Sequence, residues 1–202
     1  MDTLTQIVEA SVWNNALLYA EYRKLIDSLL IEEKTTGGNS TGSLLQYTKL
    51  NVQRMNRIEK TFVPDSLSLD VFRSVGKSLK WLVISEGWCS DAAQSLPVMV
   101  KLASLNSFID LKIVLRDRHL NLMDQHLTNG TRSIPKLLVM DEQFTVIASW
   151  GSRPQEAQQM VLDLKAKGYT HDDWLEKLHT WYAKDKGKSA EREIAGIIKK
   201  LI

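Results

Sequence analysis

KWLVISEGWCSDA, residues 80–92, is the stretch that decides the fold. Residues 81–85 begin with four apolar residues and are rich in β-branched and aromatic side chains, a composition that predicts a buried strand. After a short turn, apolar residues recur at helical spacing from about residue 90 to 105, and a second strand-like run occupies 111–115. A helix between two such strands predicts a parallel pair with a right-handed crossover.

The chain continues with a second set of predicted elements. A short helix over residues 120–127 comes first. Two strand-like runs, 136–140 and 144–149, are separated by only three residues, which predicts an antiparallel hairpin. Ser152 then opens a predicted helix that runs to residue 165, with Pro154 in its first turn.

Helical patterns flank this core on both sides. The predicted helices are residues 4–33, 43–62, 66–79 and 171–202, the last broken near Gly187. The Gly/Ser/Thr stretch 35–42 between the first two is interpreted as a plain connector, because no Lys-Ser or Lys-Thr follows its last glycine as a phosphate-binding P-loop requires. We therefore expect a helical N-terminal extension (1–69) packed on a core domain (70–168), and a C-terminal helical extension (169–202).

Composition narrows the class of function. The 202 residues carry 26 Lys plus Arg and 24 Asp plus Glu, so a net charge of +2 gives no field that would attract nucleic acid or an anionic membrane. The first residues lack a signal-peptide pattern, and no run of about 18 apolar residues occurs. A single cysteine excludes an intramolecular disulfide and favours a cytoplasmic location.

Trp88-Cys89-Ser90-Asp91-Ala92 resembles the Trp-Cys-Gly-Pro-Cys motif of thioredoxin, and three further matches follow it. They are Pro97 inside the helix, Ser133-Ile134-Pro135 before the hairpin and Trp150-Gly151 after the last strand. The resemblance covers roughly residues 70–168 and implies an α/β thioredoxin fold, a central mixed sheet flanked by helices, with helical N- and C-terminal extensions. The Trp-Cys-x-Asp-Ala motif looks like that of a bacterial subgroup of thioredoxin-like proteins.

Three positions depart from the thioredoxin pattern. Ala92 stands where thioredoxin has its second cysteine, so the ordinary dithiol cycle is excluded and an external thiol would have to resolve any mixed disulfide. Val83 replaces the buried acid that assists proton transfer. Asp91 replaces the proline of the motif and places a negative charge beside the thiol.

Cys89 is the predicted catalytic residue, because unpaired N–H groups at a helix start stabilise a thiolate. Nearby carboxylates of Asp91 and Glu86 would oppose that effect. The resemblance also predicts substrate-binding positions, which are Trp88, Ser90, Asp91, Ile134 and Pro135. A cis bond before Pro135 would present the preceding backbone to an extended peptide, and Arg132 and Lys136 beside it would favour an acidic partner.

Two functions compete. The leading hypothesis is a monothiol oxidoreductase in cytosolic redox homeostasis, in which Cys89 forms a mixed disulfide with a protein disulfide or a low-molecular-weight thiol compound. The alternative is a redox-inactive module that binds proteins or peptides. A fold can be retained after its original activity is lost, and a lone cysteine is most often a small buried hydrophobic residue.

Other chemistries receive less support. A peroxidase is disfavoured because Glu86 stands where peroxiredoxins have Thr or Ser. An iron–sulfur role shared with glutathione stays open. The four histidines are too scattered to suggest zinc, so no metal or other cofactor is expected. The sequence leaves the oligomeric state open.

Overall fold

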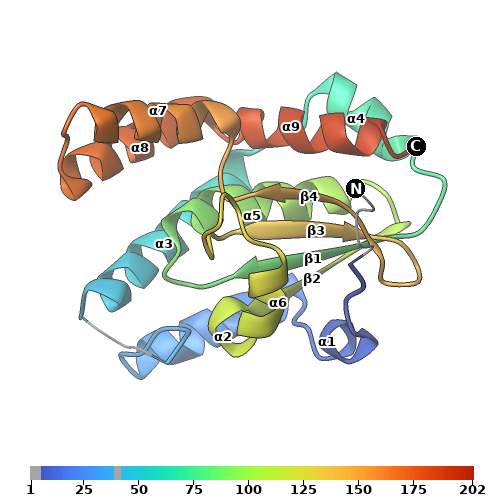
Figure 1. Ribbon diagram of the computed structural model, residues 1–202, viewed down its shortest axis with the longest axis horizontal. Coiled ribbons are helices and arrows are strands. Elements are labelled where there is room, and N and C mark those ends of the chain that lie inside the picture. The colour runs from blue at the N-terminus through green and yellow to red at the C-terminus, as the bar shows by residue number, and fades with distance from the viewer. Residues whose placement is uncertain (1–5, 39–41) are drawn as a thin grey trace.

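The computed structural model describes residues 6–38 and 42–202. Its centre is a mixed four-stranded sheet in the order β2-β1-β3-β4 (Figure 1). The strands are β1 (Leu79–Ser85), β2 (Ile109–Leu115), β3 (Lys136–Met140) and β4 (Val146–Gly151). β1 and β2 are parallel, whereas β3 is antiparallel to both β1 and β4. The predicted parallel pair and hairpin are therefore both present.

Side chains of β1 alternate between two apolar clusters, one on each face of the sheet. Trp81 and Val83 belong to the larger cluster, with residues of α2 (Tyr19–Ile31), α3 (Gly42–Thr61), α4 (Ser66–Arg73), α5 (Ser90–Ala103) and α9 (Lys188–Lys199). Leu82 and Ile84 belong to the smaller one, with residues of α1 (Ala10–Asn14) and α6 (Leu120–Gln125). Burial on both faces explains why this strand is a continuous apolar run. Figure 1 shows α9 and α6 on opposite sides of the sheet.

The N-terminal segment departs from the predicted single helix over 4–33. It forms α1 and α2 with a break between them, and residues 4 and 5 lie outside the described part of the chain. In the break, the backbone of Leu17 exchanges two hydrogen bonds of 2.8 Å with Ile113 on the outer edge of β2. A strand edge offers unpaired N–H and C=O groups, and satisfying them outweighs the helical propensity of this short stretch.

Two other predicted helix limits are wrong. The helix expected over 66–79 ends at Arg73, because Leu79 already begins β1. The helix expected from Ser152 begins at Gln155, directly after Pro154, and forms α7 (Gln155–Ala166). Proline has no N–H to contribute, which suits the start of a helix.

The C-terminal extension forms α8 (His171–Asp185) and α9. α7 and α8 pack together around a small apolar cluster that includes Val161, Leu178 and Tyr182. Gly187, between α8 and α9, has φ of +85°, and a Cβ there would lie 2.6 Å from Cγ2 of Val98. Only glycine fits this turn, which seats α9 against α5. Within the described residues, no helix is long and apolar enough to cross a membrane.

Candidate functional site

Cys89 lies at the N-cap of α5, at the predicted helix start. Its Sγ accepts the backbone N–H of Ala92 at 3.4 Å and donates its proton to the carbonyl oxygen of Ile134 at 3.2 Å. The residue is 8% exposed. The expected exposed thiol is therefore not found: the helix start is correct, but the sulfur is buried and already has a hydrogen-bond acceptor.

The loop before Cys89 is held by two residues of the N-terminal extension, which we call the N-terminal clamp. Oγ1 of Thr36 accepts the N–H of Gly87 at 2.7 Å, and Nδ2 of Asn51 donates to the carbonyl of Gly87 at 2.9 Å. Both side chains are buried. The described part of the predicted connector 35–42, residues 35–38 and 42, thus includes a residue that fixes the loop; residues 39–41 lie outside the described chain.

Trp88 is half-buried, and the guanidinium of Arg116 lies 4.7 Å from its ring centroid, a cation–π contact. Arg116 also forms an ion pair with Asp117, with Nη2 2.8 Å from Oδ1. Ser90 is also half-buried, and its Oγ accepts a 3.1 Å hydrogen bond from Arg54. Both predicted binding residues are thus engaged within the chain.

Asp91 is buried in the first turn of α5 and is held by two residues that we call the C-terminal clamp. Arg153, just before α7, forms an ion pair with its carboxylate, with Nη2 2.5 Å from Oδ2. The hydroxyl of Tyr182, on α8, donates to Oδ1 at 2.7 Å. A hydrogen bond from the C-terminal extension and an ion pair from the segment before α7 therefore meet at the residue two positions after the thiol.

These surroundings disfavour the thiolate. Burial raises the pKa of the Cys89 thiol to about 12, and the charge of Asp91 adds to that rise. The N–H of Ala92 and the guanidinium of Arg153 act in the opposite direction but do not offset burial. Glu86 is fully buried, and burial raises the pKa of its carboxyl too, although Oε1 accepts the N–H of Asp117 at 2.9 Å. At neutral pH the thiol is protonated, as its bond to Ile134 requires.

The bond between Ile134 and Pro135 is cis, and both residues are buried next to Cys89. A Cβ on Gly151 would lie 2.1 Å from the Pro135 carbonyl oxygen, so β4 can approach this segment only with glycine there. The structure does not support the expectation that Arg132 and Lys136 attract an acidic partner. Arg132 forms two bonds with Asp124, of 2.6 and 2.7 Å, and Lys136 is buried.

A family profile described as Thioredoxin matches residues 37–170. The chain belongs to this thioredoxin family. A crystal structure of a Pseudomonas aeruginosa protein of unknown function is similar over 98% of this chain and 100% of that one, with 19% identity and a TM-score of 0.62. An HIV epitope scaffold is similar over 95% and 97%, with 20% identity and a TM-score of 0.62. At these identities the two structures support the fold alone. No curated protein matches the sequence.

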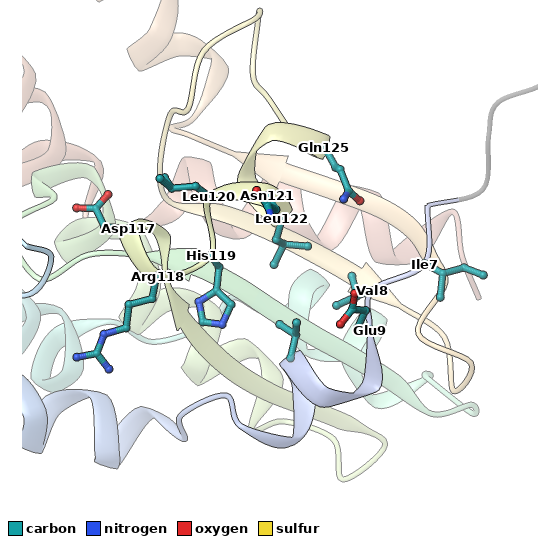
Figure 2. A pocket seen from close by; sticks show the side chains of 11 residues that line it. Ile7, Val8, Glu9, Asp117, Arg118, His119, Leu120, Asn121, Leu122 and Gln125 are labelled. Atoms are coloured by element: carbon teal, nitrogen blue, oxygen red, sulfur yellow. The ribbon is translucent and has the colours of Figure 1, made fainter.

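A cavity of about 460 Å³ lies outside the thiol site of this thioredoxin-family protein, beside α6 and η1 (Arg116–Arg118). Figure 2 shows Glu9 of the N-terminal segment and His119 on opposite walls, with Leu122 between them. Cys89 and the other predicted binding residues do not line it. Among the described residues, no group of three or more His, Cys, Asp or Glu side chains could hold a metal ion.

Four residues of the thioredoxin site were missed by sequence reasoning: Thr36, Asn51, Arg153 and Tyr182. Each lies in or near the extensions, and its hydrogen-bond partner, Gly87 or Asp91, is 36 to 91 positions away in the sequence. No local pattern marks a contact over that range. The buried charge of Asp91 was the one available signal, because a buried carboxylate requires a cationic or hydrogen-bonding partner.

Proposed function

We propose that this chain is a thioredoxin-fold module that binds a protein or peptide, and that its Cys89 is a structural thiol without a role in disulfide exchange. The observation that carries the proposal is the hydrogen bond that the buried Cys89 thiol donates to the carbonyl oxygen of Ile134. A thiol must ionise to attack a disulfide. Here ionisation would break that bond and place a second negative charge beside Asp91.

The fold offers a place for such a partner. Trp88 and Ser133 are half-buried, so part of the border of the site stays reachable. Tryptophan is the side chain most enriched at the energetic centre of interfaces. The proposal includes membership of the bacterial subgroup with the Trp-Cys-x-Asp-Ala motif and a cytoplasmic location, which the single cysteine favours.

Thiol reactivity tests the redox part of this proposal. The native chain is incubated with glutathione disulfide at pH 7.5 and analysed by mass spectrometry, with the unfolded chain in guanidinium as the positive control. We expect no glutathione adduct on the native chain and one on the unfolded chain. A native adduct that forms as fast as the unfolded one would overturn the structural role of Cys89.

Partner binding is tested separately. Peptides selected from a displayed library on the wild-type chain are expected to bind Cys89→Ala with unchanged Kd. The same peptides should bind Trp88→Ala about tenfold more weakly. Tyr169→Ala, an exposed aromatic residue beyond α7, is the matched control. The proposal of a binding module is contradicted if the library yields no binder, or if the selected peptides no longer bind Cys89→Ala.

One observation favours the second candidate, monothiol exchange. The N–H of Ala92 already points at Sγ and would stabilise a thiolate once formed. In that reaction Cys89 sulfur attacks a disulfide, one new S–S bond forms, and the displaced thiolate takes up a proton. Native glutathionylation in the first experiment would assign this function instead.

A further inference from the structure

We propose that the cavity beside α6 and η1 binds a small organic cation, a guanidinium or ammonium group joined to a short hydrocarbon chain. Glu9 on one wall and His119 on the opposite wall are the residues that hold it (Figure 2). The proposal goes beyond the proposed function, because neither Cys89 nor the other residues predicted to bind a partner line this cavity. Its volume of about 460 Å³ lies within the range of small-molecule sites.

Hydrogen bonds of the chain itself fix the wall that carries Glu9. The N–H of Val8 donates to the carbonyl of Phe144 at 3.0 Å, which holds the N-terminal segment beside the turn between β3 and β4. Nε2 of Gln6 donates to the carbonyl of Gln125, at the end of α6, at 2.7 Å. The N-terminal wall is therefore joined to the α6 wall, and a ligand meets a preformed site.

Glu9 supplies a negative charge that is not neutralised. Within the part of the chain that the structure describes, its carboxylate accepts the hydroxyl of Ser11 at 3.2 Å and has no ion-pair partner. The other carboxylate of the cavity, that of Asp117, is paired with Arg116. Arg118 also lines the cavity, but Figure 2 shows its side chain directed away from Glu9. The unpaired carboxylate thus favours a cation between the walls.

His119 supplies a second hydrogen-bond acceptor. Its Nδ1 lies 3.0 Å from the carbonyl oxygen of Leu115. Because a carbonyl oxygen can only accept, the proton of the neutral imidazole is on Nδ1, and Nε2 keeps its lone pair. The half-buried ring lines the cavity, and the backbone already occupies Nδ1, so Nε2 is the ring nitrogen available to a ligand.

The two acceptors and the wall between them define the ligand. A guanidinium group can bind the carboxylate of Glu9 through two parallel hydrogen bonds. An N–H donor at the other end of the ligand satisfies Nε2 of His119. The wall includes the apolar side chains of Val8, Val12 and Leu122, which suit a hydrocarbon linker. An anion lacks the donors that both walls require.

NMR titration of the ¹⁵N-labelled chain at pH 7.5 and low salt measures the affinity. The main probe is agmatine, which has a guanidinium and an ammonium group on a short hydrocarbon chain. Butylguanidine has the guanidinium alone, and butyrate is the anionic counterpart. We expect agmatine to shift the amide signals of Glu9 and His119 with a Kd below about 1 mM, and butylguanidine to bind about tenfold more weakly. No shifts at about 10 mM agmatine, or tighter binding of butyrate, overturns the proposal.

Two substitutions test the two walls. Glu9→Gln keeps the size of the side chain but removes its charge, and both cations should bind about tenfold more weakly. His119→Asn keeps an N–H donor for the carbonyl of Leu115 but removes the lone pair of Nε2. Agmatine should then bind only as tightly as butylguanidine, whose affinity stays unchanged. Glu176→Gln, at an exposed position of α8, is the matched control and should change neither affinity. Equal losses in Glu9→Gln and Glu176→Gln would contradict a specific site.

Two further variants test the cavity with both acceptors retained. Val12 is half-buried in the wall, so Val12→Phe places a larger side chain in the space that the ligand needs. Asn121→Tyr, at an exposed position of the wall, narrows the same space without changing the core. Both variants should lose agmatine binding, and unchanged binding in both would refute the proposal. The proposed function is tested separately, because a chain that selects no peptide at Trp88 can still bind agmatine.

Discussion

Two clamps meet at the start of α5, and they differ in kind. The N-terminal clamp holds the backbone of Gly87 through the neutral side chains of Thr36 and Asn51. The C-terminal clamp holds the carboxylate of Asp91 through Arg153 and Tyr182. The first fixes the position of the loop whatever the pH, whereas the second also fixes a charge. The comparison indicates that segments from both sides of the core domain reach the start of α5, one to hold the loop and the other to hold a charge.

The two clamps should also differ in energy. Removing one partner of a buried neutral hydrogen bond costs about 1–3 kcal/mol, because a polar group is left without a partner. Removing one partner of a buried ion pair costs about 3–5 kcal/mol, because the group left behind is charged. Stability measurements on one residue of each clamp therefore test whether the distinction is real.

Arg153→Met carries the largest expected effect. It keeps the aliphatic stem but leaves the carboxylate of Asp91 without a cation, and the free energy of unfolding should fall by about 3 kcal/mol. Urea denaturation at pH 7 measures this change. Arg118→Met, at an exposed arginine, is the matched control and should change stability by less than about 0.5 kcal/mol. Equal effects of the two substitutions would mean that the ion pair between Arg153 and Asp91 contributes nothing to the free energy of unfolding.

Asn51→Ala tests the neutral clamp. The fully buried amide donates to Gly87 and accepts from Arg54, so its loss should reduce the free energy of unfolding by about 2 kcal/mol. The pKa of Cys89, measured from the pH dependence of its alkylation by iodoacetamide, should stay unchanged, because no charge is removed. Gln53→Ala, on the exposed face of the same helix, is the control. A shifted thiol pKa in Asn51→Ala would erase the distinction between the clamps.

The sequence predicts the core elements well because their signals are local. The strands predicted at 81–85 and 136–140 and the helix start at Cys89 follow from apolar runs and turn residues within a few positions. The break at Leu17 could not be predicted this way, since its cause is the edge of β2 almost a hundred residues later. The two clamps could not be predicted for the same reason, since their contacts join distant parts of the sequence: Tyr182 lies 91 residues from Asp91.

Exposure of the thiol is the point at which local reasoning failed. A helix start predicts a stabilised thiolate, and Ala92 does supply the expected N–H. Burial raises the pKa more than this hydrogen bond lowers it, and burial depends on how distant segments cover the helix start. The charge of Asp91 could be foreseen from sequence, but not that Arg153 and Tyr182 hold it in a closed site.

His179→Leu gives the smallest expected effect and extends the comparison to pH. His179 lies on α8, and burial with the nearby charges of Arg54 and Arg57 lowers its pKa to about 4. Neither ring nitrogen has a hydrogen-bond partner among the described residues. The pKa of this histidine is lower in the folded chain than in the unfolded chain. Its contribution to the free energy of unfolding is therefore complete above pH 6.5 and is lost as the pH falls from about 6.5 to 4.

The free energy of unfolding of the wild type should therefore fall over that interval. The loss in His179→Leu should be smaller, by about 1 kcal/mol at pH 5, a modest difference because solvent screens a partly exposed ring. Melting curves at pH 7 and pH 5 provide the comparison. His171→Leu, at the exposed start of the same helix, should follow the wild type. Because the N-terminal clamp contains no titratable group, any acid-sensitive loosening of the helix start should come from the C-terminal side. Equal pH dependence in wild type and His179→Leu would show that His179 is not the source of the acid sensitivity.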